Sequence, residues 1–135
     1  MATEILILAL AGLLLLAHIL LAVRLKTKQY GTAWNTGARD AELPPLNAVA
    51  GRLERARDNF METLPLALIG LFGVVLADKA NTVTAAAGWV WLAARVVYLP
   101  LYWTGVPKVR TLVWGVSLLA LLTILGVLVL GHQGT

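Results

Sequence analysis

The sequence of residues Ile5–Val23 is ILILALAGLLLLAHILLAV, in which His18 is the only ionisable side chain. A run of this length is close to the ~20 apolar residues that an α-helix needs to cross ~30 Å of hydrocarbon. Three further runs of similar length and character follow, at Phe60–Ala77, Val83–Trp103 and Thr111–Leu130. Membrane strands alternate between apolar and polar residues, whereas these runs are apolar on all sides. The sequence therefore predicts an all-α integral membrane protein, built as a bundle of four transmembrane helices.

The composition of the chain excludes several other classes of protein. Of 135 residues, 59% are hydrophobic, 13% are charged and none is cysteine, and the mean hydropathy is +0.80. A soluble domain carries ~25% charged residues. The missing cysteines exclude a disulfide scaffold, and the hydropathy excludes a disordered chain. We expect one domain over residues 1–135, with helices at approximately 5–23, 47–77, 83–103 and 111–130 and a long loop at 24–46.

The basic residues predict the orientation of the bundle. The loop side contains nine of the eleven Lys and Arg residues, which are Arg24, Lys26, Lys28, Arg39, Arg52, Arg55, Arg57, Lys108 and Arg110. The opposite side has Lys79 alone. Because cytoplasmic loops are enriched in Lys and Arg, we expect both termini on the non-cytoplasmic side. The net charge of +4 then reflects topology, and no nucleic-acid partner is expected. The first run lacks a preceding basic segment, so we expect a retained helix rather than a cleaved signal peptide.

Ionisable residues inside the apolar runs mark the candidate site, because they are costly in lipid. Arg95 lies in the third run, ~12 Å from its cytoplasmic end at 1.5 Å per residue, and Glu62 is the only acid at comparable depth. Tyr98 and Tyr102 follow Arg95 on one helix face, and Arg110 opens the fourth helix. Two interpretations stay open: a structural Arg95–Glu62 ion pair beside interfacial tyrosines, or a basic, tyrosine-lined pocket.

A polar stripe precedes and enters the second run. Arg52, Arg55, Asn59 and Glu62 are spaced three, four and three residues apart, so they share one helix face. This stripe is either a solvated juxtamembrane face or a wall of the pocket. Because arginines outnumber acids around it, we expect a bound anion. We expect His18 to form an interhelical hydrogen bond, and two His without Cys predict no metal site.

The segment Arg55–Pro65, RARDNFMETLP, resembles the signature of the MAPEG family, the membrane-associated proteins in eicosanoid and glutathione metabolism. Three further segments resemble motifs of this family in the same order, and they are Val23–Lys26, Arg95–Tyr102 and Gly105–Arg110. The resemblance covers nearly the whole chain, and the short loops are similar to those of bacterial members.

The resemblance implies a homotrimer that binds glutathione as a co-substrate between subunits, near the cytoplasmic face. Arg110 and Tyr102 are the implied catalytic residues, which stabilise the thiolate. The implied glutathione-binding residues, carried over position by position, are Arg24, Arg55, Asn59, Glu62, Arg95, Tyr98, Tyr102 and Arg110. Thr111 occupies the place of a serine proposed as catalytic in one eicosanoid branch.

Departures from the family pattern bear on the activity. Asp58 stands where the eicosanoid-synthesising branch has an arginine, and Val97 and Tyr98 also differ from that branch. The resemblance therefore implies a glutathione S-transferase-like enzyme of the bacterial inner membrane, a transferase or peroxidase acting on lipophilic electrophiles. One alternative is a non-catalytic scaffold protein with the same fold, which Asp58 favours. A remote alternative is a small multidrug transporter, although the first helix has only His18 where such carriers need a buried acid.

Overall fold

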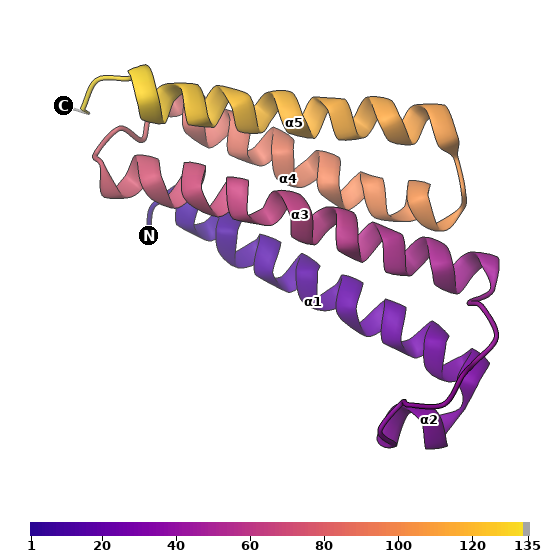
Figure 1. The fold of residues 1–135 in the computed structure, drawn as a ribbon. Coiled ribbons are helices and arrows are strands. Elements are labelled where there is room, and N and C mark those ends of the chain that lie inside the picture. The colour runs from indigo at the N-terminus through magenta and orange to yellow at the C-terminus, as the bar shows by residue number, and fades with distance from the viewer. Residues whose placement is uncertain (134–135) are drawn as a thin grey trace.

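The computed structural model describes residues 1–133, which form five helices and no strand (Figure 1). Their bounds are α1, Thr3–Tyr30; α2, Thr32–Thr36; α3, Ala48–Leu76; α4, Thr82–Trp103; and α5, Pro107–Leu130. All except the short α2 are long and apolar enough to cross a membrane. The predicted all-α fold with four candidate membrane spans is therefore confirmed.

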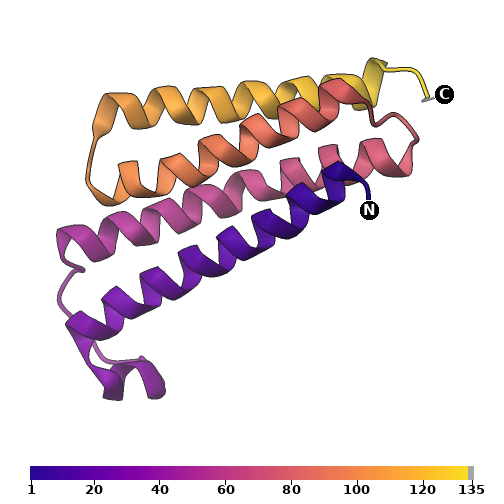
Figure 2. The same cartoon turned by 180° about the vertical axis from the view of Figure 1, so that it is seen from behind.

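The helices are arranged as a bundle from which α1 diverges. Helices α3, α4 and α5 lie side by side, and α1 packs along α3 before it leaves the bundle toward α2 (Figures 1 and 2). Both termini and the α3–α4 turn lie at one end, which we call the terminal end. The opposite end holds α2 and the α4–α5 turn, and we call it the basic end because Arg24–Arg57 and Lys108–Arg110 lie there.

Two helix boundaries differ from those predicted. Helix α1 continues past Val23 to Tyr30, because no Gly or Pro interrupts it and long polar side chains suit a helix as well as apolar ones. It ends where Gly31 adopts a φ of 96°, which a residue without Cβ tolerates. Helix α5 starts at Pro107 rather than Thr111, since proline is preorganised for the first helical turn. The loop between the first two spans is therefore shorter than predicted, and it contains α2.

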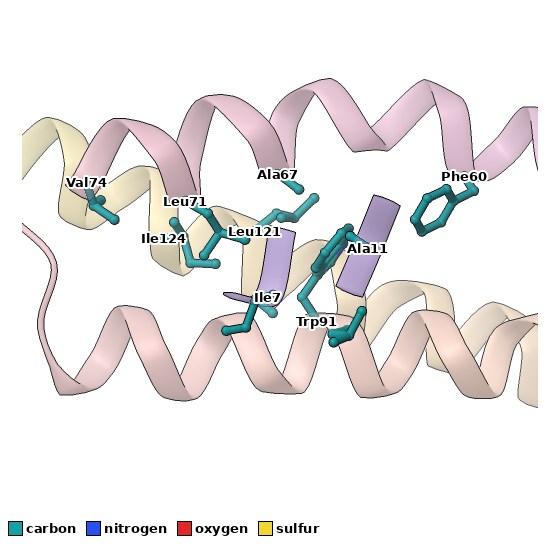
Figure 3. Packing of buried hydrophobic residues seen from close by; sticks show 11 residues of the cluster. Ile7, Ala11, Phe60, Ala67, Leu71, Val74, Trp91, Leu121 and Ile124 are labelled. Atoms are coloured by element: carbon teal, nitrogen blue, oxygen red, sulfur yellow. The ribbon is translucent and has the colours of Figure 1, made fainter. Parts of the chain in front are cut away.

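The core is an apolar cluster to which all four long helices contribute (Figure 3). Its fully buried members are Ile7, Ala11, Phe60, Ala67, Leu71, Val74, Trp91 and Ile124. The rings of Phe60 and Trp91 stack with their centroids 6.1 Å apart. Gly88 brings α4 close to α1, because a Cβ there would lie 2.7 Å from Cδ1 of Ile7. This packing turns Phe60 inward and so fixes the rotation of α3 near the basic end.

At the terminal end, a buried acid connects α1 to α4. The Oγ1 atom of Thr84 donates a hydrogen bond to Oε2 of Glu4 at 2.6 Å, and Glu4 is only 4% exposed. Thr84 also belongs to the capping box with Asn81 that starts α4. The N-terminus of a helix carries partial positive charge, so a carboxylate is stabilised there.

Candidate functional site

Arg95 is completely buried inside the bundle (0% exposed). Its Nη1 atom donates a hydrogen bond to Oδ1 of Asn59 at 2.9 Å. Its guanidinium carbon lies 4.4 Å from the ring centroid of Tyr98 and 5.2 Å from that of Phe60. Both distances suit cation–π attraction. An amide oxygen and two aromatic rings therefore hold Arg95, with no carboxylate among its partners in residues 1–133.

The predicted Arg95–Glu62 ion pair is wrong. Glu62 is exposed on the outer face of α3, and Asn59 takes its place beside Arg95. Residues three positions apart lie about 60° apart around a helix of 3.6 residues per turn. Because Phe60 is packed into the core, the rotation of α3 that brings Asn59 inward leaves Glu62 outside. Asn59 is also nearer the basic end than Glu62, which is the direction in which a buried Arg side chain snorkels.

A pocket of about 220 Å³ opens at the basic end, between the start of α3 and the α4–α5 turn. We call it the arginine pocket, and it is lined by Arg52, Arg55, Tyr102, Gly105, Pro107 and Arg110. The guanidinium carbon of Arg110 lies 4.5 Å from the ring centroid of Tyr102. The pocket thus combines three guanidinium groups with one phenol.

Tyr98 connects the arginine pocket to the buried Arg95. Its hydroxyl oxygen lies 3.5 Å from Nη1 of Arg110, at the long limit of a hydrogen bond, and its ring packs edge-on against Tyr102 at 5.5 Å. Tyr98 is itself only 1% exposed. The site therefore has two layers: a solvent-accessible one with Tyr102 and Arg110, and a buried one with Tyr98 and Arg95.

Arg52 belongs to the arginine pocket, although the family resemblance does not imply it. Its Nε atom donates to the backbone oxygen of Trp103 at 2.9 Å, so it also caps the end of α4. Gly105 makes the approach possible, because its φ of 77° turns the chain beneath the Arg52 guanidinium. The spacing of Arg52 and Arg55 on one helix face had indicated that Arg52 could form a wall of the pocket, and the structure places it there.

The two carboxylates in the first turns of α3, Glu54 and Asp58, are paired with other cations. Glu54 pairs with Lys26 at 2.6 Å and with Arg57 at 3.6 Å, and Asp58 pairs with Arg57 at 3.0 Å. Asp58 is 56% exposed and does not line the arginine pocket. No carboxylate within residues 1–133 therefore forms an ion pair with any of the three arginines of the pocket. Such a site attracts an anion.

Comparison with known proteins identifies the family of this chain. The model of the MAPEG family matches residues 5–130, nearly the whole chain. The chain belongs to the MAPEG family. No curated protein and no solved structure is significantly similar to it. MAPEG membership supports a membrane function related to glutathione or eicosanoids, and the four candidate spans agree with an integral membrane protein.

In the structure of this MAPEG protein, the predicted site residues fall into three groups by position. Arg55, Tyr102 and Arg110 line the arginine pocket, and Asn59, Arg95 and Tyr98 form a chain of contacts beneath it. Arg24 and Glu62 lie apart from the pocket of the single chain: Arg24 borders a different groove, and Glu62 is on the outer face of α3.

One further prediction about a side chain of this MAPEG protein is corrected, namely the interhelical hydrogen bond of His18. His18 is 1% exposed and stacks on Phe60 with ring centroids 5.0 Å apart, and neither ring nitrogen has a hydrogen-bond partner among the described residues. The expected interhelical hydrogen bond of His18 is therefore absent there.

Thr111 is exposed, and its hydroxyl donates to the backbone oxygen of Pro107 at 3.1 Å. Residues 1–133 contain no cluster of His, Asp or Glu suited to a metal ion.

Proposed function

We propose that this MAPEG protein is a glutathione-dependent membrane transferase or peroxidase that acts on lipophilic electrophiles. The arginine pocket is the observation that carries the proposal. Arg52, Arg55 and Arg110 meet there without an ion-paired carboxylate in the described residues, next to the phenol of Tyr102. Guanidinium groups form bidentate hydrogen bonds with carboxylates, and glutathione contains two carboxylates.

Arg110 and Tyr102 are the proposed catalytic residues. A free thiol of the cysteine type has a pKa of about 8.5, and a nearby cation lowers it. In the transferase reaction, the thiol of glutathione loses its proton to water. The sulfur lone pair then forms a C–S bond with the electrophilic carbon of the substrate, and the leaving group departs from that carbon with its bonding electrons. In the peroxidase reaction, two glutathione molecules are oxidised to their disulfide while a hydroperoxide is reduced to an alcohol and water. The chain has no cysteine, so the co-substrate supplies the thiol.

We propose a homotrimer, as the family resemblance implies, with glutathione at the subunit interfaces. Two observations support contact between neighbouring copies. The arginine pocket measures about 220 Å³, below the ~300–1,000 Å³ typical of ligand pockets. A tripeptide would therefore extend beyond it onto a neighbouring surface. Glu62 is exposed on an apolar stretch of α3, where a charge facing lipid is costly. A second copy packed against this face would cover it.

The proposed location is the bacterial inner membrane, with the basic end in the cytoplasm. The excess of Lys and Arg at this end supports that orientation. A lipophilic substrate has an apolar surface available between α4 and α5. It is a groove of about 330 Å³, lined by Val90, Ala93, Ala94, Val97, Val113 and Val116.

Titration calorimetry with glutathione tests the proposal. Purified protein in detergent should give saturable heat at or below millimolar glutathione, and Arg110→Ala should weaken binding by at least about ten-fold because one charged contact is lost. Lys108→Gln is the matched control, since Lys108 is a neighbouring exposed cation that does not line the pocket. Absence of heat in the unmodified protein would instead favour the non-catalytic scaffold.

A further inference from the structure

A second recess adjoins the arginine pocket along the first turns of α3. It is a groove of about 460 Å³, and we call it the charged groove. It is lined by residues 45–48 and, further along the helix, by Gly51, Glu54, Arg55 and Asp58. The start of α3 is at the basic end of the bundle (Figure 1). Because Arg55 lines both the charged groove and the arginine pocket, the two recesses meet at its side chain.

The guanidinium of Arg55 lies against Gly51. A Cβ atom at position 51 would be 3.2 Å from Nη1 of Arg55 and 3.9 Å from its guanidinium carbon. The missing side chain of Gly51 therefore leaves room for the charged group of Arg55, and not only for its aliphatic stem, where the two recesses meet. Arg55 is exposed and forms no ion pair within residues 1–133. Its positive charge is thus available to a ligand.

Asp58 supplies an opposite charge on the same face of α3. Residues three positions apart on a helix have Cβ atoms ~5–6 Å apart, which applies to Arg55 and Asp58. Both hydrogen bonds from Arg57 to Asp58 end on Oδ1, at 3.2 and 3.0 Å. Oδ2 of Asp58 accepts no hydrogen bond within residues 1–133, and the side chain is 56% exposed. The charged groove therefore presents a guanidinium next to an available carboxylate oxygen.

Glu54 is less suited than Asp58 to act with Arg55. Adjacent residues of a helix do not face each other, so Glu54 points away from Arg55 around the helix. Glu54 also pairs with two cations, Lys26 at 2.6 Å and Arg57 at 3.6 Å, and its side chain is 30% exposed. Asp58 is thus the carboxylate of the groove with more negative charge left for a ligand.

The paired charges of the charged groove complement the free end of an α-amino acid, which carries an ammonium and a carboxylate on one carbon atom. Charge-assisted hydrogen bonds can then form on both sides, from Arg55 to the carboxylate and from the ammonium to Asp58. A ligand with the carboxylate alone would meet the uncompensated charge of Asp58, and an amine alone would meet that of Arg55. Such opposed charges produce specificity by rejecting the wrong ligand.

We propose that the charged groove binds the γ-glutamyl end of glutathione, with the α-carboxylate on Arg55 and the α-ammonium on Asp58. This inference rests on the proposed function and adds Asp58 as a specificity-determining residue, which the family resemblance does not imply. The cysteinyl part of the peptide then extends into the arginine pocket, toward Arg110. The two recesses together reach the ~300–1,000 Å³ typical of ligand pockets, whereas the arginine pocket alone does not.

Two glutathione analogues test the assignment. Glutaryl-cysteinyl-glycine lacks only the α-ammonium of glutathione, and 4-aminobutyryl-cysteinyl-glycine lacks only its α-carboxylate. The full chain in detergent is titrated calorimetrically with all three peptides at one ionic strength, because salt screens contacts between exposed charges. We expect the unmodified protein to bind glutathione about five-fold more tightly than either analogue, the upper end of what exposed ion pairs contribute.

The variants should change these preferences selectively. Asp58→Asn should abolish the preference for glutathione over the glutaryl analogue and leave the Kd of that analogue unchanged. Arg55→Gln should abolish the preference over the 4-aminobutyryl analogue. Asp40→Asn is the matched control, since it removes an exposed aspartate that does not line the groove, and it should keep both preferences. Circular dichroism establishes that each variant remains helical.

The possible failures of this inference and of the proposed function are distinguishable. Binding of glutathione without discrimination against the glutaryl analogue would overturn the role of Asp58 and leave the proposed function intact. A preference that survives in Asp58→Asn but is lost in Glu62→Gln would assign the ammonium to Glu62 instead. If the unmodified protein binds none of the three peptides, the proposed function and this inference are both wrong.

Discussion

Within the bundle, Oδ1 of Asn59 accepts a hydrogen bond from Nη1 of Arg95 at 2.9 Å, the only hydrogen bond of the Arg95 side chain in residues 1–133. An amide oxygen satisfies a donor without cancelling its charge. The positive charge of Arg95 therefore persists against the face of Tyr98, whose hydroxyl lies near Arg110. A carboxylate in place of Asn59 would neutralise that charge.

Replacement of Asn59 should destabilise the bundle. In Asn59→Leu the guanidinium of Arg95 loses its acceptor while it stays buried, and hydrogen bonds to charged groups contribute about 1.5–3 kcal/mol. The free energy of unfolding of each variant is measured by titration with sodium dodecyl sulfate in mixed micelles. Asn59→Asp keeps an acceptor and should be stable, whereas a fully stable Asn59→Leu would contradict the assigned role of Asn59.

Arg110→Ala should abolish most glutathione conjugation of a model aryl halide. Loss of one group that stabilises developing negative charge lowers kcat by about 10²–10³-fold. Tyr102→Phe removes only the phenol hydroxyl and should have a smaller effect of the same sign. The oligomeric state, measured by native mass spectrometry, should not change. Unchanged turnover in Arg110→Ala would remove Arg110 from the catalytic assignment.

Arg52→Gln should weaken glutathione binding, because Arg52 lines the arginine pocket. We expect the Kd to rise by about ten-fold for the loss of one charge-assisted contact. Calorimetric titration gives this value. Arg57→Gln is the matched control, since Arg57 lies on the same helix but pairs with Glu54 and Asp58 outside the pocket. An equal effect of both variants would indicate a general charge effect rather than a contact in the pocket.

The Glu4–Thr84 hydrogen bond should stabilise the terminal end without affecting the site. Thr84→Val and Glu4→Gln each disturb it, and a double-mutant cycle should give a coupling free energy of about 0.5–3 kcal/mol. The same variants should leave glutathione binding unchanged, since the arginine pocket lies at the opposite end of the bundle. Zero coupling energy would mean that the contact does not contribute to stability.

The membrane spans were predictable because hydrophobicity over a window of one helix is a local property. The runs predicted at 83–103 and 47–77 agree closely with α4, Thr82–Trp103, and α3, Ala48–Leu76. The end of α1 was misplaced, because polar residues also extend a helix until Gly31 interrupts it. Hydropathy predicts the part of a helix that lies inside the lipid, but it does not predict how far the helix continues outside it.

The sequence by itself determined the all-α membrane class, the four spans, the family and the end of the bundle that carries the basic residues, because these depend on composition and spacing along the chain. Only the tertiary structure decided the partners of the buried groups. Packing of Phe60 into the core sets the rotation of α3, which brings Asn59 rather than Glu62 to Arg95. The α4–α5 turn brings Arg52 and Arg110 into one pocket, and the divergence of α1 gives Arg24 a groove of its own. Rotation and divergence of helices arise from contacts between distant segments, and no local pattern specifies them.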